Sequence, residues 1–164
     1  MERRPVIVSG GQTGVDRAAL DAALELGWPA GGWCPRGRLA EDGAIPERYP
    51  LRELAGGYLE RTRKNVQDSD ATLIVGFGPP TGGTARTIDF CRQEGRPWLL
   101  LDASVTPLEE AVGLVRGFID RHGIGILNVA GPRASGEPRS YDYARELVRR
   151  VLTAPSQSSS DQDR

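Results

Sequence analysis

Five short apolar runs alternate with helical patterns along the chain, and this alternation limits the folds that the sequence can adopt. The runs lack the regular polar alternation of a half-exposed strand, which is typical of strands buried on both faces. Repeated strand–helix units predict a parallel sheet with helices on both faces. The expected strands are residues 5–9, 28–33, 71–77, 97–102 and 125–131, and the expected helices are residues 15–26, 58–67, 84–94, 107–122 and 140–151.

Length and composition fit one α/β domain. The chain has 164 residues, of which 38% are hydrophobic and 26% charged, and this is enough for a core without disulfides or metals. We expect a single doubly wound, Rossmann-like domain with a sheet of about five or more strands over residues 1–153. The last segment, 154–164, reads APSQSSSDQDR and lacks apolar content, so we expect a disordered tail there.

Charge and hydropathy narrow the range of partners. The formal net charge is −1, so no overall field attracts nucleic acid or anionic lipid. Lys64 is the single lysine among 21 basic residues, so an anion site here is built from arginines and backbone amides. No apolar stretch approaches the roughly 20 residues that span a bilayer, and the first residues do not resemble a signal peptide. We expect a cytoplasmic protein with no membrane partner.

Local signals mark two helix starts and one long loop. Thr106, with Pro107 and then Glu109, is typical of a capping box, and Ser140 is placed to cap the last helix. The stretch 34–53 is rich in proline and glycine, so we expect it to be irregular. Structureless loops of this length are commonly functional.

Two glycine-rich loops each follow an expected strand and open an expected helix. They read Gly10-Gly11-Gln12-Thr13-Gly14 and Gly82-Gly83-Thr84. A helix start presents unpaired N–H groups and a positive dipole end, so either loop can hold phosphate or another anion; alternatively, the glycines only make tight turns. Ligands of open parallel sheets bind outside the carboxyl ends of the strands. We therefore expect both loops to border one crevice, together with residues 34–48 and 130–140.

Two familiar phosphate-binding motifs are absent. A P-loop needs lysine and then serine or threonine after its last glycine, but Val15 and Asp16 stand there. A dinucleotide fingerprint needs the spacing G-x-G-x-x-G and an acidic residue after the second strand, where this chain has Cys34-Pro35-Arg36. Hydride transfer with a nicotinamide cofactor is therefore not expected.

Several longer segments carry a resemblance to a known family: GGQTGVDRAALD, GWCPRGRLAEDGAIPERYPL, RTRKNVQDSDATLI, GGTARTIDFC and LNVAGPR. Over residues 6–152 the chain resembles the molybdenum-cofactor carrier proteins, which belong to a Rossmann-like superfamily that includes the lysine-decarboxylase-like proteins. The resemblance implies a homo-oligomer, a dimer or tetramer. It also implies binding of molybdenum cofactor (molybdopterin), a phosphorylated pterin, as cargo for storage or transfer without catalysis.

More distant relatives in that superfamily are phosphoribohydrolases, and the chain departs from their pattern. Arg61 matches their arginine, but Thr62 replaces the lysine that follows it and Thr87 stands where their catalytic glutamate would be. Without that carboxylate, an oxocarbenium-like transition state lacks its usual stabiliser. If the protein is nevertheless an enzyme, Asp42 and Glu41 in the long loop are the catalytic candidates; their alternative is solvated loop charge.

Other side chains are candidates for ligand contact. Asp16 either supports the start of its helix or accepts hydrogen bonds from the amino and ring N–H groups of a pterin or purine. Arg36 and Arg38 are either phosphate ligands or surface arginines. Arg61 shares a helix face with Asn65, and the family resemblance favours Arg61 as an anion ligand.

Arg133, the two cysteines and the single histidine are the remaining candidates. Arg133 follows the last strand and is a candidate anion ligand. Two cysteines, Cys34 and Cys91, are too few for a disulfide framework or zinc site, and small buried hydrophobes are their commoner role. His122, the single histidine, fits the end of its helix. No metal site is expected.

These observations favour a binding protein over an enzyme. The expected ligand is a small phosphorylated heterocycle; a nucleotide hydrolase acting on an N-glycosidic or phosphate bond, and a non-catalytic nucleotide sensor, stay open as alternatives. The expected binding residues are Gly10, Gly11, Gln12, Thr13, Gly14, Asp16, Arg36, Arg61, Gly82, Gly83, Thr84 and Arg133.

Overall fold

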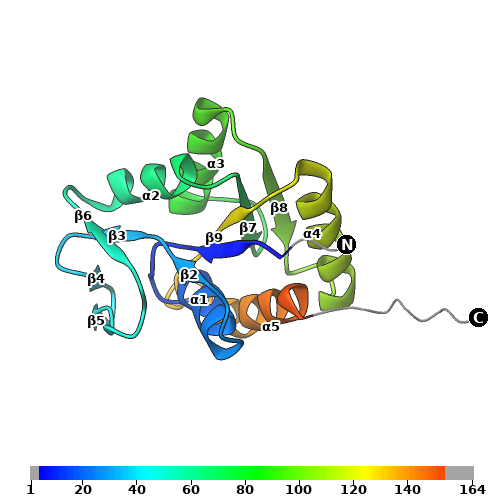
Figure 1. Cartoon of the computed structure of the whole chain (residues 1–164), viewed down its shortest axis with the longest axis horizontal. Helices are drawn as coiled ribbons and strands as arrows, with labels where there is room; N and C mark the ends of the chain where they lie inside the picture. Colours follow the sequence, from blue (N-terminus) through cyan, green and yellow to red (C-terminus); the bar gives the residue numbers. More distant parts are fainter. Residues whose placement is uncertain (1–3, 154–164) are drawn as a thin grey trace, which may run out of the picture.

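A parallel five-stranded sheet forms the centre of the protein. The computed structural model describes residues 4–153, so the predicted tail, 154–164, lies outside the described residues. The strand order in the sheet is β2-β1-β9-β7-β8 (Figure 1). The strands are β1 (Val6–Val8), β2 (Ala30–Gly31), β7 (Ala71–Gly76), β8 (Trp98–Asp102) and β9 (Ile126–Ala130).

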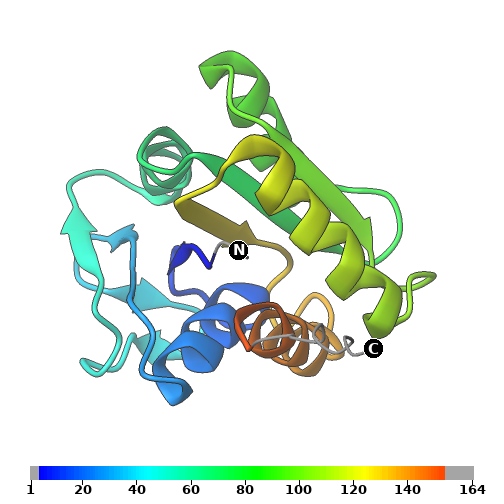
Figure 2. The same ribbon diagram turned by 45° about the vertical axis from the view of Figure 1, so that its right-hand side comes forward.

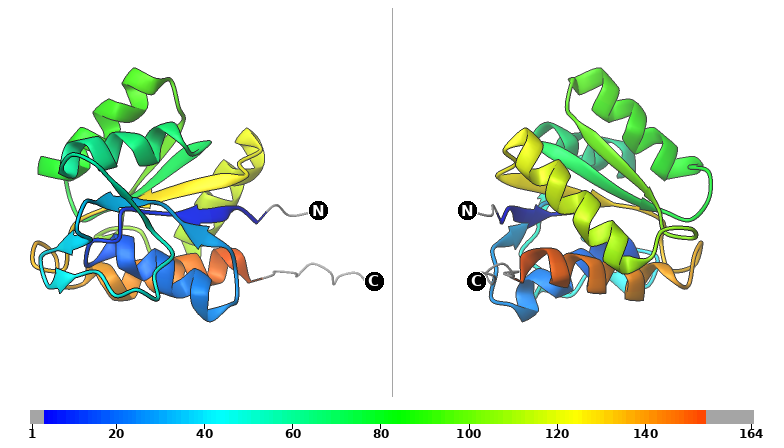
Figure 3. Two further views of the ribbon diagram at one scale, coloured as in Figure 1. Left: turned by 60° about the vertical axis from the view of Figure 1, so that its left-hand side comes forward. Right: turned by 90° about the vertical axis from the view of Figure 1, so that its right-hand side faces the viewer.

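Helices cover both faces of this sheet, which confirms the predicted α/β fold (Figures 2 and 3). The connections from β1 to β2 and from β8 to β9 run one way across the sheet, and those from β2 to β7 and from β7 to β8 run the other way. Because such crossovers are right-handed, the two directions place their helices on opposite faces. One face carries α1 (Val15–Glu25), α4 (Leu108–His122) and α5 (Ser140–Leu152), and the other carries α2 (Tyr58–Gln67) and α3 (Gly82–Glu94).

The core lies between the sheet and the layer of α1, α4 and α5. All six residues of β7 are buried, as expected for a central parallel strand covered on both faces. On the helix side, α1 contributes small residues that allow close approach to the sheet and to α5. The largest hydrophobic cluster includes Ile7, Ala19, Leu73, Val115, Ile119, Leu127 and Leu147.

The stretch 34–53 is more regular than its composition predicts. It contains parts of two small sheets, formed by the parallel pair β3 (Trp33–Pro35) and β6 (Arg52–Leu54) and the antiparallel pair β4 (Leu39–Ala40) and β5 (Gly43–Ala44). The expectation of an irregular loop was therefore wrong in part. Strands of two or three residues are too short to produce a periodic pattern, so the sequence does not reveal them.

Two polar side chains hold this segment in place. Arg38, which has a positive φ of 54°, donates hydrogen bonds to the backbone carbonyls of Ile45, Pro46, Tyr49 and Leu51. Asn65 of α2 accepts a bond from the Trp33 N–H and donates one to the Trp33 carbonyl, both at 2.9 Å. The segment is thus tied internally by Arg38 and to α2 by Asn65.

Both capping predictions were wrong. The α4 helix begins at Leu108 with Pro107 at the N-cap position, and proline has no side-chain group that can cap. Ser140 is the first residue of α5, not its N-cap, and its buried hydroxyl has no hydrogen-bond partner among the described residues. The turn before α5 is instead organised by Glu137, whose carboxylate accepts from the N–H of Arg139.

A tight contact next to β9 gives a stability prediction. A Cβ added at Gly131 would lie 2.4 Å from the carbonyl oxygen of Val75 and 2.6 Å from Cγ2 of Val15. We expect Gly131→Ala to lower the free energy of unfolding by about 1–3 kcal/mol in urea titrations, because backbone has to move. Gly113→Ala is the matched control, since nothing lies within 4 Å of a Cβ there, and this change in an exposed helix should stabilise by about 0.5–1 kcal/mol. Equal effects of the two variants would contradict the assigned contact.

Candidate functional site

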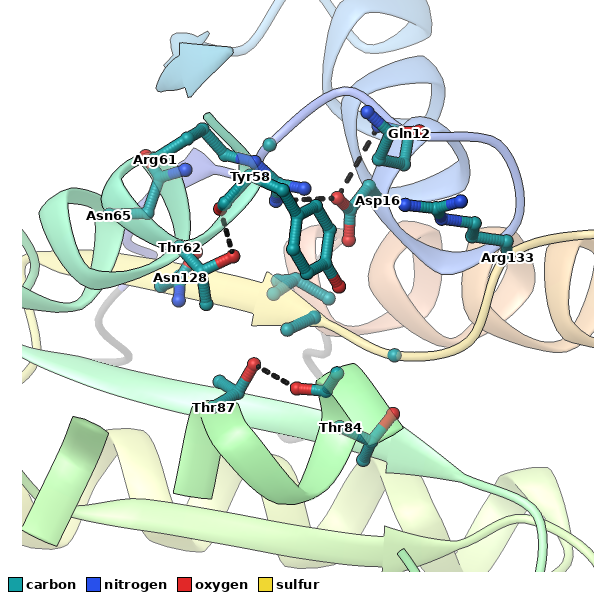
Figure 4. Close-up of a pocket in the computed structure, with 15 residues that line it drawn as sticks. Gln12, Asp16, Tyr58, Arg61, Thr62, Asn65, Thr84, Thr87, Asn128 and Arg133 are labelled. Atoms are coloured by element: carbon teal, nitrogen blue, oxygen red, sulfur yellow. Dashed lines mark hydrogen bonds and ion pairs between the residues drawn. The ribbon is translucent and has the colours of Figure 1, made fainter. Parts of the chain in front are cut away.

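A cavity lies at the carboxyl ends of the strands, between the loops that lead to the two helix layers. The loop after β1 leads to α1 on one face of the sheet, and the loop after β7 leads to α3 on the other, so a crevice opens at the carboxyl ends of the strands. The cavity holds about 30 Å³ of free space (Figure 4). We call it the inner cavity; its lining includes Gly10, Gln12, Asp16, Tyr58, Arg61, Thr62, Asn65, Gly83, Thr84, Thr87, Asn128, Gly131 and Arg133.

Arg61 is the most unusual residue of this lining. Its side chain is about 6% exposed, and its Nε and Nη2 atoms have no hydrogen-bond partner among the described residues. Its Nη1 lies 3.5 Å from Oδ2 of Asp16, and its guanidinium stacks 4.6 Å from the centre of the Tyr58 ring. Buried donors without acceptors are costly, and charged donors especially so. The free N–H groups of Arg61 therefore form a binding position for an acceptor, most favourably an anion.

The two glycine loops give Arg61 and Tyr58 the space that they occupy. A Cβ at Gly10 would lie 1.9 Å from Nη1 of Arg61, and a Cβ at Gly83 would lie 2.1 Å from the hydroxyl oxygen of Tyr58. Real Cβ atoms do not approach other atoms so closely, so neither position accepts a larger residue without displacement. These two glycines therefore do more than make turns.

Asp16 supplies the carboxylate of the inner cavity. It lies in the first turn of α1, and its Oδ2 accepts a bond of 3.4 Å from the Gln12 N–H. Burial raises the pKa of Asp16 to about 6, although the positive charges of Arg61 and, more weakly, Arg133 oppose that rise. The cavity thus contains an acid whose protonation changes close to neutral pH.

Polar groups from three other elements complete the wall. The guanidinium of Arg133, just after β9, lies 5.2 Å from the centre of the Tyr58 ring, so this ring is contacted by two arginines. The hydroxyls of Thr62 and Thr87 donate to backbone carbonyls of their own helices. The Asn128 side chain donates to the hydroxyl of Thr72 on β7. These three polar groups are satisfied within the protein, unlike those of Arg61.

Glu41 and Asp42, the catalytic candidates from sequence, lie outside the inner cavity. Glu41 accepts hydrogen bonds from the hydroxyls of Thr13 and Ser135, and these bonds lower its pKa. Asp42 forms an ion pair with Arg17, with an N–O distance of 2.6 Å, and this contact lowers its pKa as well. Glu41 therefore connects three loops, Asp42 connects its loop to α1, and both carboxylates stay ionised at neutral pH.

The remaining predicted residues shape the loops or lie further out. Gly11 and Gly14 have φ values of 78° and 81°, which other residues rarely adopt, and Gly82 begins α3. Arg36 is exposed beside a second cavity that adjoins the first. The other arginine of that loop, Arg38, is occupied by the four carbonyls described above and is not available to phosphate.

Two lining residues, Tyr58 and Asn128, were not singled out from sequence. Tyr58 lies three, four and seven positions before Arg61, Thr62 and Asn65, and this spacing places all four on one helix face. This spacing is the signal in the sequence for Tyr58, because a buried polar helix face is commonly a binding surface. Asn128 interrupts an apolar strand, which is a weaker signal of the same kind.

The cysteines and the histidine have structural surroundings. Cys34 and Cys91 are buried and free, and burial raises the pKa of both thiols. The His122 ring packs edge-on against Phe118, with centroids 5.1 Å apart. Within residues 4–153, no three His, Cys, Asp or Glu side chains gather as a metal site would require.

Fold and cavity define a Rossmann-like α/β domain with a polar cleft at the carboxyl edge of its sheet. The chain belongs to the circularly permutated YpsA SLOG family, which it matches over residues 7–152. It is also similar to a protein of known crystal structure from Syntrophus aciditrophicus SB, described as a "putative molybdenum carrier protein". The two share 44% sequence identity with a TM-score of 0.90, over 93% of this chain and 98% of that one. A comparison with curated proteins found no match.

The raised pKa of Asp16 predicts a pH-dependent stability term. Between about pH 4 and pH 6 the folded protein keeps the Asp16 proton that the unfolded chain has lost, so stability falls as pH rises through this window. Relative to Asp16→Asn, we expect the wild-type free energy of unfolding to decrease by up to about 3 kcal/mol from pH 4 to pH 7. Denaturant titrations of both proteins at matched pH measure the difference. A difference that does not change with pH would contradict the assignment.

The contact between Gly10 and Arg61 predicts a selective loss of binding. We expect Gly10→Ala to displace the Arg61 guanidinium and to weaken sulfate binding at least about tenfold, because the charged hydrogen bonds to the anion are lost. Calorimetric titration with sulfate measures the effect. Gly117→Ala in α4 is the control, because its added Cβ meets only the far end of Arg121, at 3.9 Å, and binding should not change.

Proposed function

We propose that this protein binds a phosphorylated heterocycle, most favourably molybdenum cofactor, for storage or transfer without catalysis. The unpartnered guanidinium of Arg61 in the inner cavity is the observation that carries the proposal. It is a buried positive charge, and the start of α3, whose helix dipole also attracts anions, lines the same cavity. The name of the similar crystal structure, a molybdenum carrier, favours this cofactor among phosphorylated ligands.

The cleft suits recognition better than bond cleavage. Asp16 is the one carboxylate lining the inner cavity, and it is held by the Gln12 N–H and lies beside Arg61. The hydroxyl of Thr87, at the position of the hydrolases' glutamate, donates to the carbonyl of Gly83. The lining therefore has no second carboxylate beside Asp16, whereas donors for an anion are present.

Removing the guanidinium tests the anion site. We expect Arg61→Ala to weaken sulfate binding by about ten- to hundredfold in calorimetric titrations, because bonds from a buried charged donor are lost. Arg63→Ala is the control: it lies on the same helix and pairs with Glu94, so sulfate binding should stay within about twofold. Arg61→Lys, which keeps the charge but not the planar fork, should fall between the two. Equal binding by wild type and Arg61→Ala would overturn the proposed site.

The cargo is identified on protein purified gently from its natural host. Native mass spectrometry, extraction of the ligand and metal analysis on one sample should reveal molybdopterin, with or without molybdenum. An ordinary nucleotide in its place would favour the sensor alternative and contradict the carrier.

A nucleotide hydrolase is the second candidate, and the pKa of Asp16 is the observation that favours it. An acid with a pKa of about 6 inside a polar cavity is suited to proton transfer near neutral pH. In that case Asp16, and not Asp42 or Glu41, is the residue on which turnover depends. Incubation with nucleoside monophosphates decides between the two functions: release of base or phosphate that is lost in Asp16→Asn would contradict a pure carrier.

We also propose the setting in which the carrier works. The family resemblance implies a homo-oligomer, either dimer or tetramer, and we propose the cytoplasm as its location. The net charge of −1 argues against a nucleic-acid partner. No helix in residues 4–153 has the length and apolar character that crossing a membrane requires.

A further inference from the structure

A second cavity adjoins the inner one and has a different lining. It holds about 370 Å³ of free space, and we call it the outer cavity. Gln12, Tyr58 and Arg133 line both cavities, so the two meet at these side chains. The rest of the outer lining combines the apolar Pro35, Leu39 and Ala40 and two glycines with the charged Arg36 and Glu41.

The inner cavity is too narrow for a fused ring system. Arg61 and Tyr58 are stacked on each other in its wall (Figure 4), and the free space beside them is about 30 Å³, which suits a small oxyanion and not a fused ring. The outer cavity is roomier, and its volume falls in the usual range for small-molecule sites. A ligand that places its anionic group beside Arg61 therefore has space for a ring in the outer cavity, on the other side of Tyr58.

The walls of the outer cavity suit the faces of a flat aromatic ring. The Leu39 side chain is an exposed large hydrophobe, 62% exposed, whose position no core contact explains. The Tyr58 ring and the guanidinium of Arg133 are planar groups that pack well against heteroaromatic faces. A lining that combines an exposed apolar side chain, planar groups and charged groups is expected for a ring with apolar faces and polar edges.

We propose that the outer cavity is the binding position of a fused heteroaromatic ring, a pterin or a purine, whose phosphate is held by Arg61 in the inner cavity. This inference rests on the proposed function and adds the orientation of the ligand. Tyr58 is the shared wall, so it contacts the phosphate-bearing linker on one side and the ring on the other. Leu39 contributes to affinity for the ring and not to affinity for the phosphate.

Three probes separate the two cavities: inorganic phosphate, neopterin monophosphate and guanosine monophosphate. We expect at least one of the two ring-bearing phosphates to bind about tenfold or more tightly than inorganic phosphate, because ring faces are buried. Leu39→Ser should remove about tenfold of this gain, through lost apolar contact, and leave inorganic phosphate binding unchanged. Which ring-bearing probe binds more tightly distinguishes a pterin site from a purine site.

Leu114→Ser is the matched control, because Leu114 is similarly exposed on α4 and should affect none of the probes. Thermal unfolding of both variants verifies that the fold is intact. If phosphate binds and depends on Arg61, but the ring adds no affinity or Leu39→Ser has no effect, the outer cavity is not the ring position while the anion site stands. If none of the three probes binds, the proposed function falls together with this inference.

Discussion

A buried guanidinium is the constraint around which the cleft is built. Placing the charge of Arg61 away from water is unfavourable unless acceptors surround it, and the protein supplies only part of them. Asp16 compensates some of the charge at 3.5 Å, and the Tyr58 ring covers one face. Gly10 is required because any side chain there would collide with the guanidinium. The two glycine loops, the start of α1 and the inward face of α2 are thus linked through Arg61 and the Tyr58 ring stacked on it.

The same arrangement links the protonation of Asp16 to occupancy of the cavity. The carboxylate and an incoming anion share the positive charge of Arg61, and both are close to Arg133. An anion bound beside Asp16 would favour its protonated form, so binding and proton uptake are coupled through a single short distance. This coupling is a property of the cavity whether the protein stores a ligand or transforms one.

Most of the architecture could be predicted from the sequence, because buried parallel strands such as β7 and amphipathic helices leave strong periodic patterns. It could also be predicted that the loops after β1, β7 and β9 lie close together, because the carboxyl ends of parallel strands meet at one edge of the sheet. The small strands from β3 to β6 could not be predicted, because two or three residues are too few to form a periodic pattern. The inward direction of Tyr58 was missed because α2 is polar on most sides, and only packing decides which polar face is buried. The loop carboxylates Glu41 and Asp42 looked catalytic because sequence does not reveal their partners.

Arg38 affects how the wall of the outer cavity behaves. One side chain satisfies four carbonyls along the segment that carries Leu39, so those backbone groups are ordered together or released together. The segment therefore behaves as a cooperative unit. Its conformational entropy is lost when the protein folds, and not when a ligand binds. A ligand entering the cleft meets a wall already in its final shape, which favours fast, reversible capture over slow closure around the cargo.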